Sequence, residues 1–406
     1  SSVGESADTT PVFTHTVWRV NLSTVPCPSG RRSMSRKHVW VQVHRGFKSH
    51  RHRQQEAPDS SGAFFVREGN SLVWQSTVER VKMPIAVIAG SSGFVGKAVR
   101  RALESEGYAI RLIGRHGADA SWGDAAAIAR TVDGADLLVN LAGKSVNCRY
   151  TDANRDEVLR SRVDTTRELH DAVSAAANPP ALWLNASTAT IYRYAMDRPQ
   201  TELTGELGSG FSVDVARNWE NEFFASAIPG VRRVALRMAI VLGDGPATNI
   251  LFTLARLGLG GPQFDGWWFQ HRRYRGIGPT PSGDGSVPIH HSKGRQRFSW
   301  IHIDDFIGAI RFIRDNPTLE GPVNLATPEA SDNRSLMAAL RSIVKAPFGL
   351  PAWRFMIEPA MWVIRTEPEL ILKSRWVVPE KLLGAGFRFE YTDLREALDD
   401  VNRRKG

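Results

Sequence analysis

The sequence has few cysteines and no long apolar run. Its 406 residues include only Cys27 and Cys148, which excludes a disulfide framework, and no spacing resembles a zinc site. No run approaches the roughly 18 apolar residues needed to cross a bilayer, so we expect no membrane partner. Glycine (35) and proline (22) are near average, which excludes collagen-like and low-complexity classes. Apolar residues make up 42% of the chain, enough for a sizeable core.

The chain is basic, with a formal net charge of +10, but the excess is local. Residues 1–82 hold 12 Lys/Arg against 6 Asp/Glu, whereas the remaining 324 residues hold 40 against 36. The main body is therefore nearly balanced, and its charge gives no reason to expect nucleic acid as a partner.

Residues 1–82 are interpreted as a basic extension outside the fold. Their short apolar stretches, Val39–Val43 and Ala63–Val66, have no partner pattern nearby. The strongly patterned sequence opens at Met83, which we take as the natural start, with residues 1–82 as upstream or misassigned sequence. An Arg- and Ser-rich organelle transit segment and a basic nucleic-acid-binding arm are the alternatives. We expect a cytoplasmic protein, or an organellar one if the segment is a transit sequence.

From Met83 onward, buried strands alternate with amphipathic helices. This alternation predicts an α/β fold of the Rossmann type, a doubly wound parallel sheet, with a small C-terminal helical cap. We expect domains at 83–340 and 341–406, with a long substrate-side loop at 258–297. The expected strands are Ile85–Ala89, Ala109–Ile113, Leu137–Leu141, Leu182–Ala186, Val234–Leu242 and Phe298–Ile303.

A glycine-rich turn directly follows the first strand and opens a helix. Its glycines allow a tight turn and a close approach of a pyrophosphate to the backbone, and the helix N-terminus offers free N–H groups to that anion. A strand before it, a helix after it and a second strand beyond make this a strong dinucleotide-binding signal. The residues expected to bind the cofactor here are Gly90, Ser91, Ser92, Gly93, Phe94, Val95 and Gly96.

The end of the second strand predicts which dinucleotide is bound. An NAD site usually has Asp or Glu there, but this chain has Arg115, which can pair with a 2′-phosphate. We therefore expect NADP, with NAD as the less favoured cofactor; a solvated surface cation is the other interpretation of Arg115. Asp124, after a short third strand, either accepts from the adenine amino group or caps the following helix.

Later motifs resemble those of one protein family. Asn140-Leu141-Ala142-Gly143 ends the next strand, at the carboxyl edge of the sheet where ligands bind. With residues 161–167, 299–305 and 379–389, this segment makes the chain from about 83 to 401 resemble the atypical, epimerase-family branch of the extended short-chain dehydrogenases/reductases, which has a small C-terminal domain of its own. The resemblance adds Asn140, Leu141, Ala142 and Gly143 to the expected cofactor site.

The resemblance also implies the expected chemistry. The family uses a Ser or Thr that bonds a carbonyl, and here Ser187 and Thr188 follow a strand, with Tyr192 close behind. The helix that should carry the family's Tyr and Lys, at 211–220, contains neither. Tyr192 is therefore a stand-in acid or a core aromatic, and Lys144 is a cofactor or substrate contact or an ordinary loop lysine.

Two function classes follow. The first is an NADP-dependent oxidoreductase or epimerase that acts on a small carbonyl or sugar-type substrate with a non-standard proton donor. The second is a non-catalytic, regulatory or scaffold protein that binds NADP. A small molecule is the expected partner, and a homodimer is left open.

Three further groups of polar residues have simpler interpretations. Arg237 ends a buried strand and either forms a structural ion pair or contacts a substrate phosphate. Asp304 and Asp305 are expected to cap a helix. The histidines of the long loop lack neighbouring carboxylates or cysteines, so we expect no metal; they are His271, His290 and His291.

Overall fold

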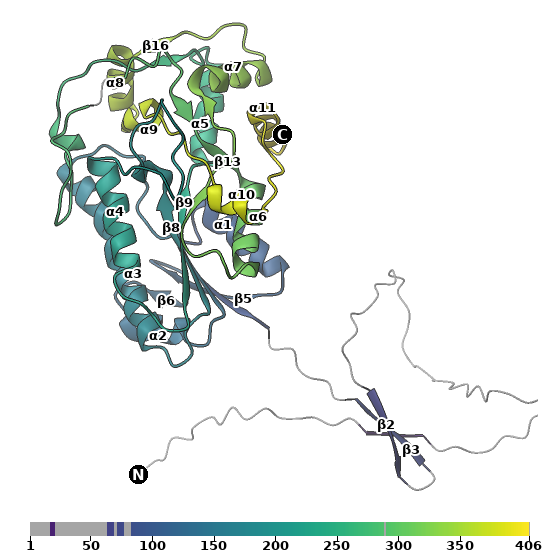
Figure 1. Ribbon diagram of the computed structural model, residues 1–406. Coiled ribbons are helices and arrows are strands. Elements are labelled where there is room, and N and C mark those ends of the chain that lie inside the picture. The colour runs from purple at the N-terminus through teal and green to yellow at the C-terminus, as the bar shows by residue number, and fades with distance from the viewer. Residues whose placement is uncertain (1–16, 21–62, 69–70, 77–82, 288–289, 406) are drawn as a thin grey trace, which may run out of the picture. The chain divides into compact units, whose positions relative to one another are not determined.

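The computed structural model describes residues 17–20, 63–68, 71–76, 83–287 and 290–405, in two compact units, Ser1–Lys82 and Met83–Gly406 (Figure 1). The first unit contains an antiparallel sheet in the order β1-β3-β2, from β1 (Val17–Val20), β2 (Ala63–Glu68) and β3 (Ser71–Ser76). The expectation that Ala63–Val66 has no partner is wrong, because β2 pairs with β3. The other apolar stretch, Val39–Val43, lies outside the described residues.

The second unit is built on a seven-stranded parallel sheet in the order β14-β9-β8-β7-β4-β5-β6, which confirms the predicted Rossmann-type α/β fold. Its strands read as unbroken apolar runs because helices cover both faces of the sheet. The strands are β4 (Ile85–Ala89), β5 (Ala109–Gly114), β6 (Ala120–Ser121), β7 (Leu137–Asn140), β8 (Leu182–Thr188), β9 (Arg232–Met238) and β14 (Gly321–Leu325).

Helices form a layer on each face of this sheet (Figure 1). On one face, α1 (Phe94–Ser105) and α6 (Ile303–Asp315) share a core with alternate side chains of the central strands, such as Ile88 and Val139. On the other face lie α2 (Ala125–Val132), α3 (Asp152–Ala175) and α4 (Phe211–Phe223), against the intervening side chains, such as Val87. Alternation of side chains along each strand divides the core in this way.

Two predicted strands are each divided. Val234–Leu242 ends its pairing in the main sheet at Met238, and β10 (Ile240–Leu242) instead pairs in parallel with β13 (Trp300–His302). Phe298 belongs to β12 (Arg297–Phe298), which pairs with β15 (Ser331–Asp332). The apolar runs continue across these breaks, so sequence pattern alone does not show where the chain changes partner.

The middle of the long loop at 258–297 is tied to helices α3 and α4 through residues 272–282. The buried Asp214 of α4 accepts from the backbone N–H groups of Ile277 and Ser282 at 3.0 and 2.6 Å. Arg155 of α3 donates to the carbonyl oxygens of Arg272 and Arg275. The loop contains β11 (Gln263–Phe264), which pairs with β16 (Ala352–Trp353), and a short 3₁₀ turn, η2 (Arg272–Tyr274).

The remaining elements lie beyond β9 in sequence, apart from η1 (Ala189–Ile191), the 3₁₀ turn after β8. They are α5 (Pro246–Arg256), α7 (Asn333–Ile343), α8 (Arg354–Val363), α9 (Glu369–Leu372), α10 (Glu380–Gly384) and α11 (Leu394–Arg403). Among the described residues, none of the helices is both long and apolar enough to cross a membrane.

The expected caps of α6 are wrong. The cap is His302, whose side chain accepts from the backbone N–H of Asp304. The carboxylate of Asp305 points elsewhere and accepts from the backbone N–H groups of Glu390 and Tyr391 at 2.7 and 3.0 Å. Asp305 therefore holds the C-terminal segment onto the Rossmann core.

Candidate functional site

Two glycines of the turn after β4 are required by packing. Gly90 has a φ of +81°, and a Cβ there would lie 2.6 Å from the carbonyl carbon of Leu141. A Cβ at Gly96 would lie 2.3 Å from the carbonyl oxygen of Gly90. The first glycine lets the turn approach the segment after β7, and the second lets α1 pack against the turn.

Gly93 is different, because the space beside it is open. Its φ is −71°, so no left-handed conformation requires glycine, and the nearest atom to a Cβ there would be the Gly90 carbonyl oxygen at 3.7 Å. No side chain caps α1, and its first turn holds no acidic residue. The start of α1 therefore has unpaired N–H donors and a partial positive charge, and the space beside Gly93 is open. This combination favours binding of an anion.

A cavity of about 400 Å³ lies at this turn, over the carboxyl ends of β4, β7 and β8. Of the predicted residues, it is lined by Gly90, Gly93, Phe94, Val95, Gly96, Leu141, Ala142, Gly143, Ser187 and Thr188. The structure thus brings together parts of three separate motifs. The predicted residues that do not line it are Ser91, Ser92, Arg115, Asp124, Asn140, Lys144 and Tyr192.

Asn140 shapes the cavity from behind. It is fully buried, its Nδ2 donates to Asn185 Oδ1 at 2.7 Å, and its Oδ1 accepts from the backbone N–H of Ala142 at 3.1 Å. The side chain therefore holds the turn from Leu141 to Gly143 that forms one wall of the cavity.

Arg115, Asp124 and Lys144 lie around the cavity. Arg115 is exposed just beyond the end of β5. Asp124 caps α2, accepting from the Ala127 N–H at 2.9 Å, which agrees with the capping interpretation. Lys144 donates to Asn154 Oδ1 at 2.9 Å and forms an ion pair with Glu157, so its ammonium is already engaged by α3.

Ser187 is the outermost member of a buried polar network. Its Oγ donates to Glu220 Oε1 at 2.5 Å, and both carboxylate oxygens of Glu220 accept from Arg237, at 2.8 and 2.7 Å. Burial alone would lower the pKa of Arg237, but the bond to Glu220 outweighs it and raises that pKa. Arg237 therefore forms the structural ion pair, one of its two predicted roles.

Tyr192 lies at the inner end of the same network. Its hydroxyl accepts from Arg237 Nη1 and donates to Asn324 Oδ1, both at 2.9 Å, and the residue is only 2% exposed. Burial raises its pKa. Tyr192 is a core aromatic in this structure and is not among the residues that line the cavity, which gives no support to its prediction as a stand-in acid.

The part of α4 that faces the cavity has no Tyr or Lys. It contributes Phe211, Ser212, Val215 and Trp219. From α3, Arg162 places its guanidinium 5.1 Å from the Trp219 ring and donates to the Val158 carbonyl at 2.9 Å.

Arg162 is a half-buried cation without an anionic partner in the described part of the chain. No carboxylate there lies within ion-pair distance of it, and burial lowers its pKa to about 10. A cavity with a bare helix N-terminus and such an arginine is suited to a doubly or triply charged phosphate ligand. The residues present therefore fit a nicotinamide dinucleotide.

A second cavity, of about 530 Å³, adjoins the first through Phe211, which lines both. Its wall includes residues of the long loop, such as Asp265 and Asp284, and residues of the C-terminal segment, Glu369 and Lys373. Sequence reasoning missed these C-terminal side chains, because no local motif marks them. The one available signal was two cations, Lys373 and Arg375, within an otherwise apolar stretch.

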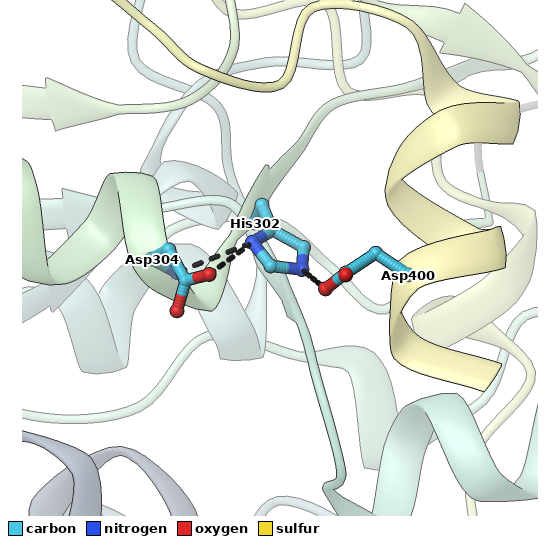
Figure 2. A group of neighbouring side chains, drawn as sticks. All are labelled: His302, Asp304 and Asp400. Atoms are coloured by element: carbon cyan, nitrogen blue, oxygen red, sulfur yellow. Dashed lines mark hydrogen bonds and ion pairs between the residues drawn. The ribbon is translucent and has the colours of Figure 1, made fainter. Parts of the chain in front are cut away.

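One cluster of possible metal ligands occurs among the described residues: His302, Asp304 and Asp400 (Figure 2). Its two carboxylates already face two arginines: Arg404 pairs with Asp304 at 2.5 Å and with Asp400 at 2.6 Å, and Arg403 pairs with Asp400 at 3.2 Å. His302 Nδ1 accepts from the Asp304 N–H, which leaves Nε2 to face Asp400 Oδ2 at 3.3 Å. The cluster fastens α11 to the start of α6.

The Rossmann-type fold and a cavity at the carboxyl edge of its sheet are the arrangement typical of dinucleotide-binding α/β proteins. The profile of the NAD dependent epimerase/dehydratase family matches residues 86–249, and that of a domain of unknown function (DUF1731) matches residues 355–401. Over these two segments the chain matches the NAD dependent epimerase/dehydratase family and, at its C-terminal end, this second domain, which confirms the predicted resemblance.

Similar proteins carry the same family name. The epimerase family protein YfhF of Bacillus subtilis is 26% identical over 77% of this chain and 96% of its own length. The epimerase family protein SDR39U1 of Mus musculus is 27% identical over 78% and 98%. A crystal structure of human SDR39U1 (isoform 2) with NADPH matches 79% of this chain and 99% of that chain, at a TM-score of 0.66 and 23% identity.

Proposed function

We propose that this protein binds NADP in the first cavity and uses it to oxidise, reduce or epimerise a small carbonyl or sugar-type substrate. One observation carries the proposal: a cavity at the carboxyl edge of the sheet joins an open glycine, an uncapped helix N-terminus and an arginine without a carboxylate partner. The relative solved with NADPH supports the choice of cofactor class.

In this proposal different residues of the chain bind different parts of the dinucleotide. The turn at Gly93 and the N-terminus of α1 take the pyrophosphate, and Arg162 takes a further phosphate or ribose oxygen. Arg115, exposed at the end of β5, pairs with the 2′-phosphate that distinguishes NADP from NAD.

The bound nicotinamide would supply a hydride acceptor or donor, and the chain's own residues would handle the substrate. Ser187 and Thr188 line the first cavity, where their hydroxyl groups could contact the carbonyl group of a bound substrate. The proton of Ser187 is committed to Glu220, so Thr188 is the better placed of the two to donate a hydrogen bond to a substrate oxygen.

The test is binding followed by turnover. We expect the purified full chain to bind NADPH more tightly than NADH in a fluorescence titration, and then to consume NADPH with at least one member of a panel of aldehydes and ketones. Failure to bind either dinucleotide would contradict the proposal at its first step.

The second candidate function is NADP binding without catalysis. It is favoured by the absence of Tyr and Lys from the cavity face of α4. Tight NADPH binding with no turnover on any carbonyl, in either direction, would select it.

For the compartment we propose the cytoplasm, since a chain with two cysteines suits a reducing environment. The Arg- and Ser-rich composition of residues 1–82 supports an organelle as the alternative. Imaging distinguishes the two compartments when residues 1–82 alone and the whole chain are each fused to a fluorescent protein.

A further inference from the structure

The wall between the two cavities contains a chain of polar contacts. Lys373 and Glu369 line the second cavity, whereas Thr190 and Ser212 line the first. Lys373 Nζ donates to the Thr190 carbonyl at 2.9 Å, and Ser212 Oγ donates to Glu369 Oε2 at 2.8 Å. Glu369 Oε1 lies 3.9 Å from Lys373 Nζ. These contacts connect a hydroxyl in the first cavity with an ammonium in the second.

Lys373 sits in a setting that disfavours its charge. Its side chain is 11% exposed, and burial lowers its pKa to about 8, helped by the charge of Arg375 and opposed by that of Glu369. The other charged or titratable groups lining its cavity are Arg193, Tyr194, Asp265, Tyr274, Asp284, His290 and Arg354. Near neutral pH such a lysine can both release and recover a proton.

The second cavity carries no surplus charge. Its three cationic side chains, Arg193, Arg354 and Lys373, are matched in number by three carboxylates, Asp265, Asp284 and Glu369. A lining of this kind suits a neutral ligand whose hydroxyl groups can accept and donate hydrogen bonds.

We propose that Lys373 is the acid–base residue of the second cavity, in place of the tyrosine and lysine that α4 lacks, and that this cavity takes a small neutral hydroxy-aldehyde or hydroxy-ketone. The inference rests on the proposed function and names its missing proton donor. Neither Tyr192 nor Lys144, the earlier candidates, lines either cavity.

In the reductive direction the chain supplies the proton. A reduced nicotinamide, when bound, would supply the hydride for the carbonyl carbon, and the C=O π pair would then become a lone pair on oxygen that needs a proton. The O–H bond of the product forms as an N–H bond of the Lys373 ammonium breaks, which leaves a neutral amine. Solvent returns the proton to that amine, and the substrate leaves as an alcohol.

The first test needs no cofactor. In the full chain alone, the pH dependence of Lys373 modification by 1-fluoro-2,4-dinitrobenzene is followed by mass spectrometry, with the exposed Lys97 as an internal reference. We expect Lys373 to reach half-maximal reactivity near pH 8, against about 10.4 for an ordinary lysine. A profile that matches Lys97 would overturn the inference.

The second test uses turnover of D-glyceraldehyde and dihydroxyacetone, with pyruvate as a charged comparison. We expect Lys373→Met to lower kcat about 100-fold or more while leaving NADPH affinity within about twofold. Lys373→Arg keeps the charge and should lose activity as well, which guards against a folding defect in the first variant. Lys381→Met is the matched control, because Lys381 also donates to a backbone carbonyl, at 2.7 Å, but lines neither cavity.

A pH profile separates catalysis from structural support. Reduction by the wild type should fall as pH rises through about 8, and Glu369→Gln should move that limb to lower pH, because Glu369 raises the pKa of Lys373. Full turnover by Lys373→Met, or a preference for pyruvate, would refute this inference and leave the proposed function standing. NADPH binding without turnover by the wild type would instead refute the proposed function itself.

Discussion

The glycine turn and the wall between the two cavities are built in opposite ways. The turn at 90–96 is contiguous, and it offers backbone groups and empty space. The wall is assembled from side chains far apart in sequence: Lys373 reaches Thr190 across 183 positions, and Glu369 reaches Ser212 across 157. A site made of backbone can be recognised in seven residues, whereas a site made of side chains becomes visible only after the chain has folded.

The largest expected effect is on folding stability, and it tests a group of side chains that come together only in the folded chain, the buried network around Arg237. Glu220→Ala leaves Arg237 buried without its carboxylate, and breaking a buried pair in this way costs about 3–5 kcal/mol of folding free energy. Urea unfolding of the variant measures this loss.

Glu222→Ala is the matched control for that prediction. Glu222 pairs with Arg167, which is about half exposed, so its loss should cost less than about 1 kcal/mol. Equal losses in the two variants would mean that the buried network around Arg237 contributes no more than a surface pair.

The next largest effect is on cofactor affinity, and it tests the glycine turn at 90–96, which is built from backbone groups. Gly93→Asp puts a carboxylate where the pyrophosphate is proposed to bind, and we expect NADPH affinity to fall by about 100-fold or more. Calorimetric titration with NADPH measures the loss.

Two alanine variants show whether that loss reflects charge or strain. Gly93→Ala should fold and bind almost normally, because its φ is negative and its Cβ would meet only one atom, at 3.7 Å. Gly90→Ala should lose stability, because its φ is positive and its Cβ would lie 2.6 Å from backbone. Near-normal binding by Gly93→Asp would mean that the dinucleotide does not lie over this turn.

The two kinds of construction also explain what the sequence predicts well. The strand–turn–helix unit at 85–105 is predicted closely, because apolar runs, glycines and helix periodicity are local. The sequence does not predict the break after Met238, because Val234–Leu242 is a nearly continuous apolar run and only pairing with β13 reveals the change of partner. The sequence predicts Asp305 as a helix cap because its partners, Glu390 and Tyr391, lie 85 and 86 positions away.

A smaller effect concerns the choice between cofactors. Arg115→Ala should weaken NADPH about tenfold to 100-fold and leave NADH nearly unchanged, because only NADPH carries the 2′-phosphate and a charge-assisted contact is worth about 1.5–3 kcal/mol. Arg101→Ala removes another exposed arginine, on α1, and should affect neither cofactor. Equal losses for the two cofactors would contradict the assignment of Arg115.

The last prediction concerns the contribution of Lys373 to the free energy of unfolding, which depends on pH. The pKa of Lys373 is lowered to about 8 in the folded chain and is about 10.4 in an unfolded one. Between these values the unfolded chain binds more protons, so wild-type stability should rise with pH across this window.

Lys373→Met lacks this dependence, and the comparison between the two proteins isolates it. The variant loses the bond to the Thr190 carbonyl at every pH, which gives a constant offset. Relative to that offset, Met should be most favourable below pH 8, where the wild type must bury an ammonium, and the advantage should vanish as pH approaches about 10.4. Urea unfolding at pH 7, 8, 9 and 10 measures the difference. A difference that stays constant across this range would show that Lys373 keeps an ordinary pKa, and that the wall between the cavities does not prepare it for proton transfer.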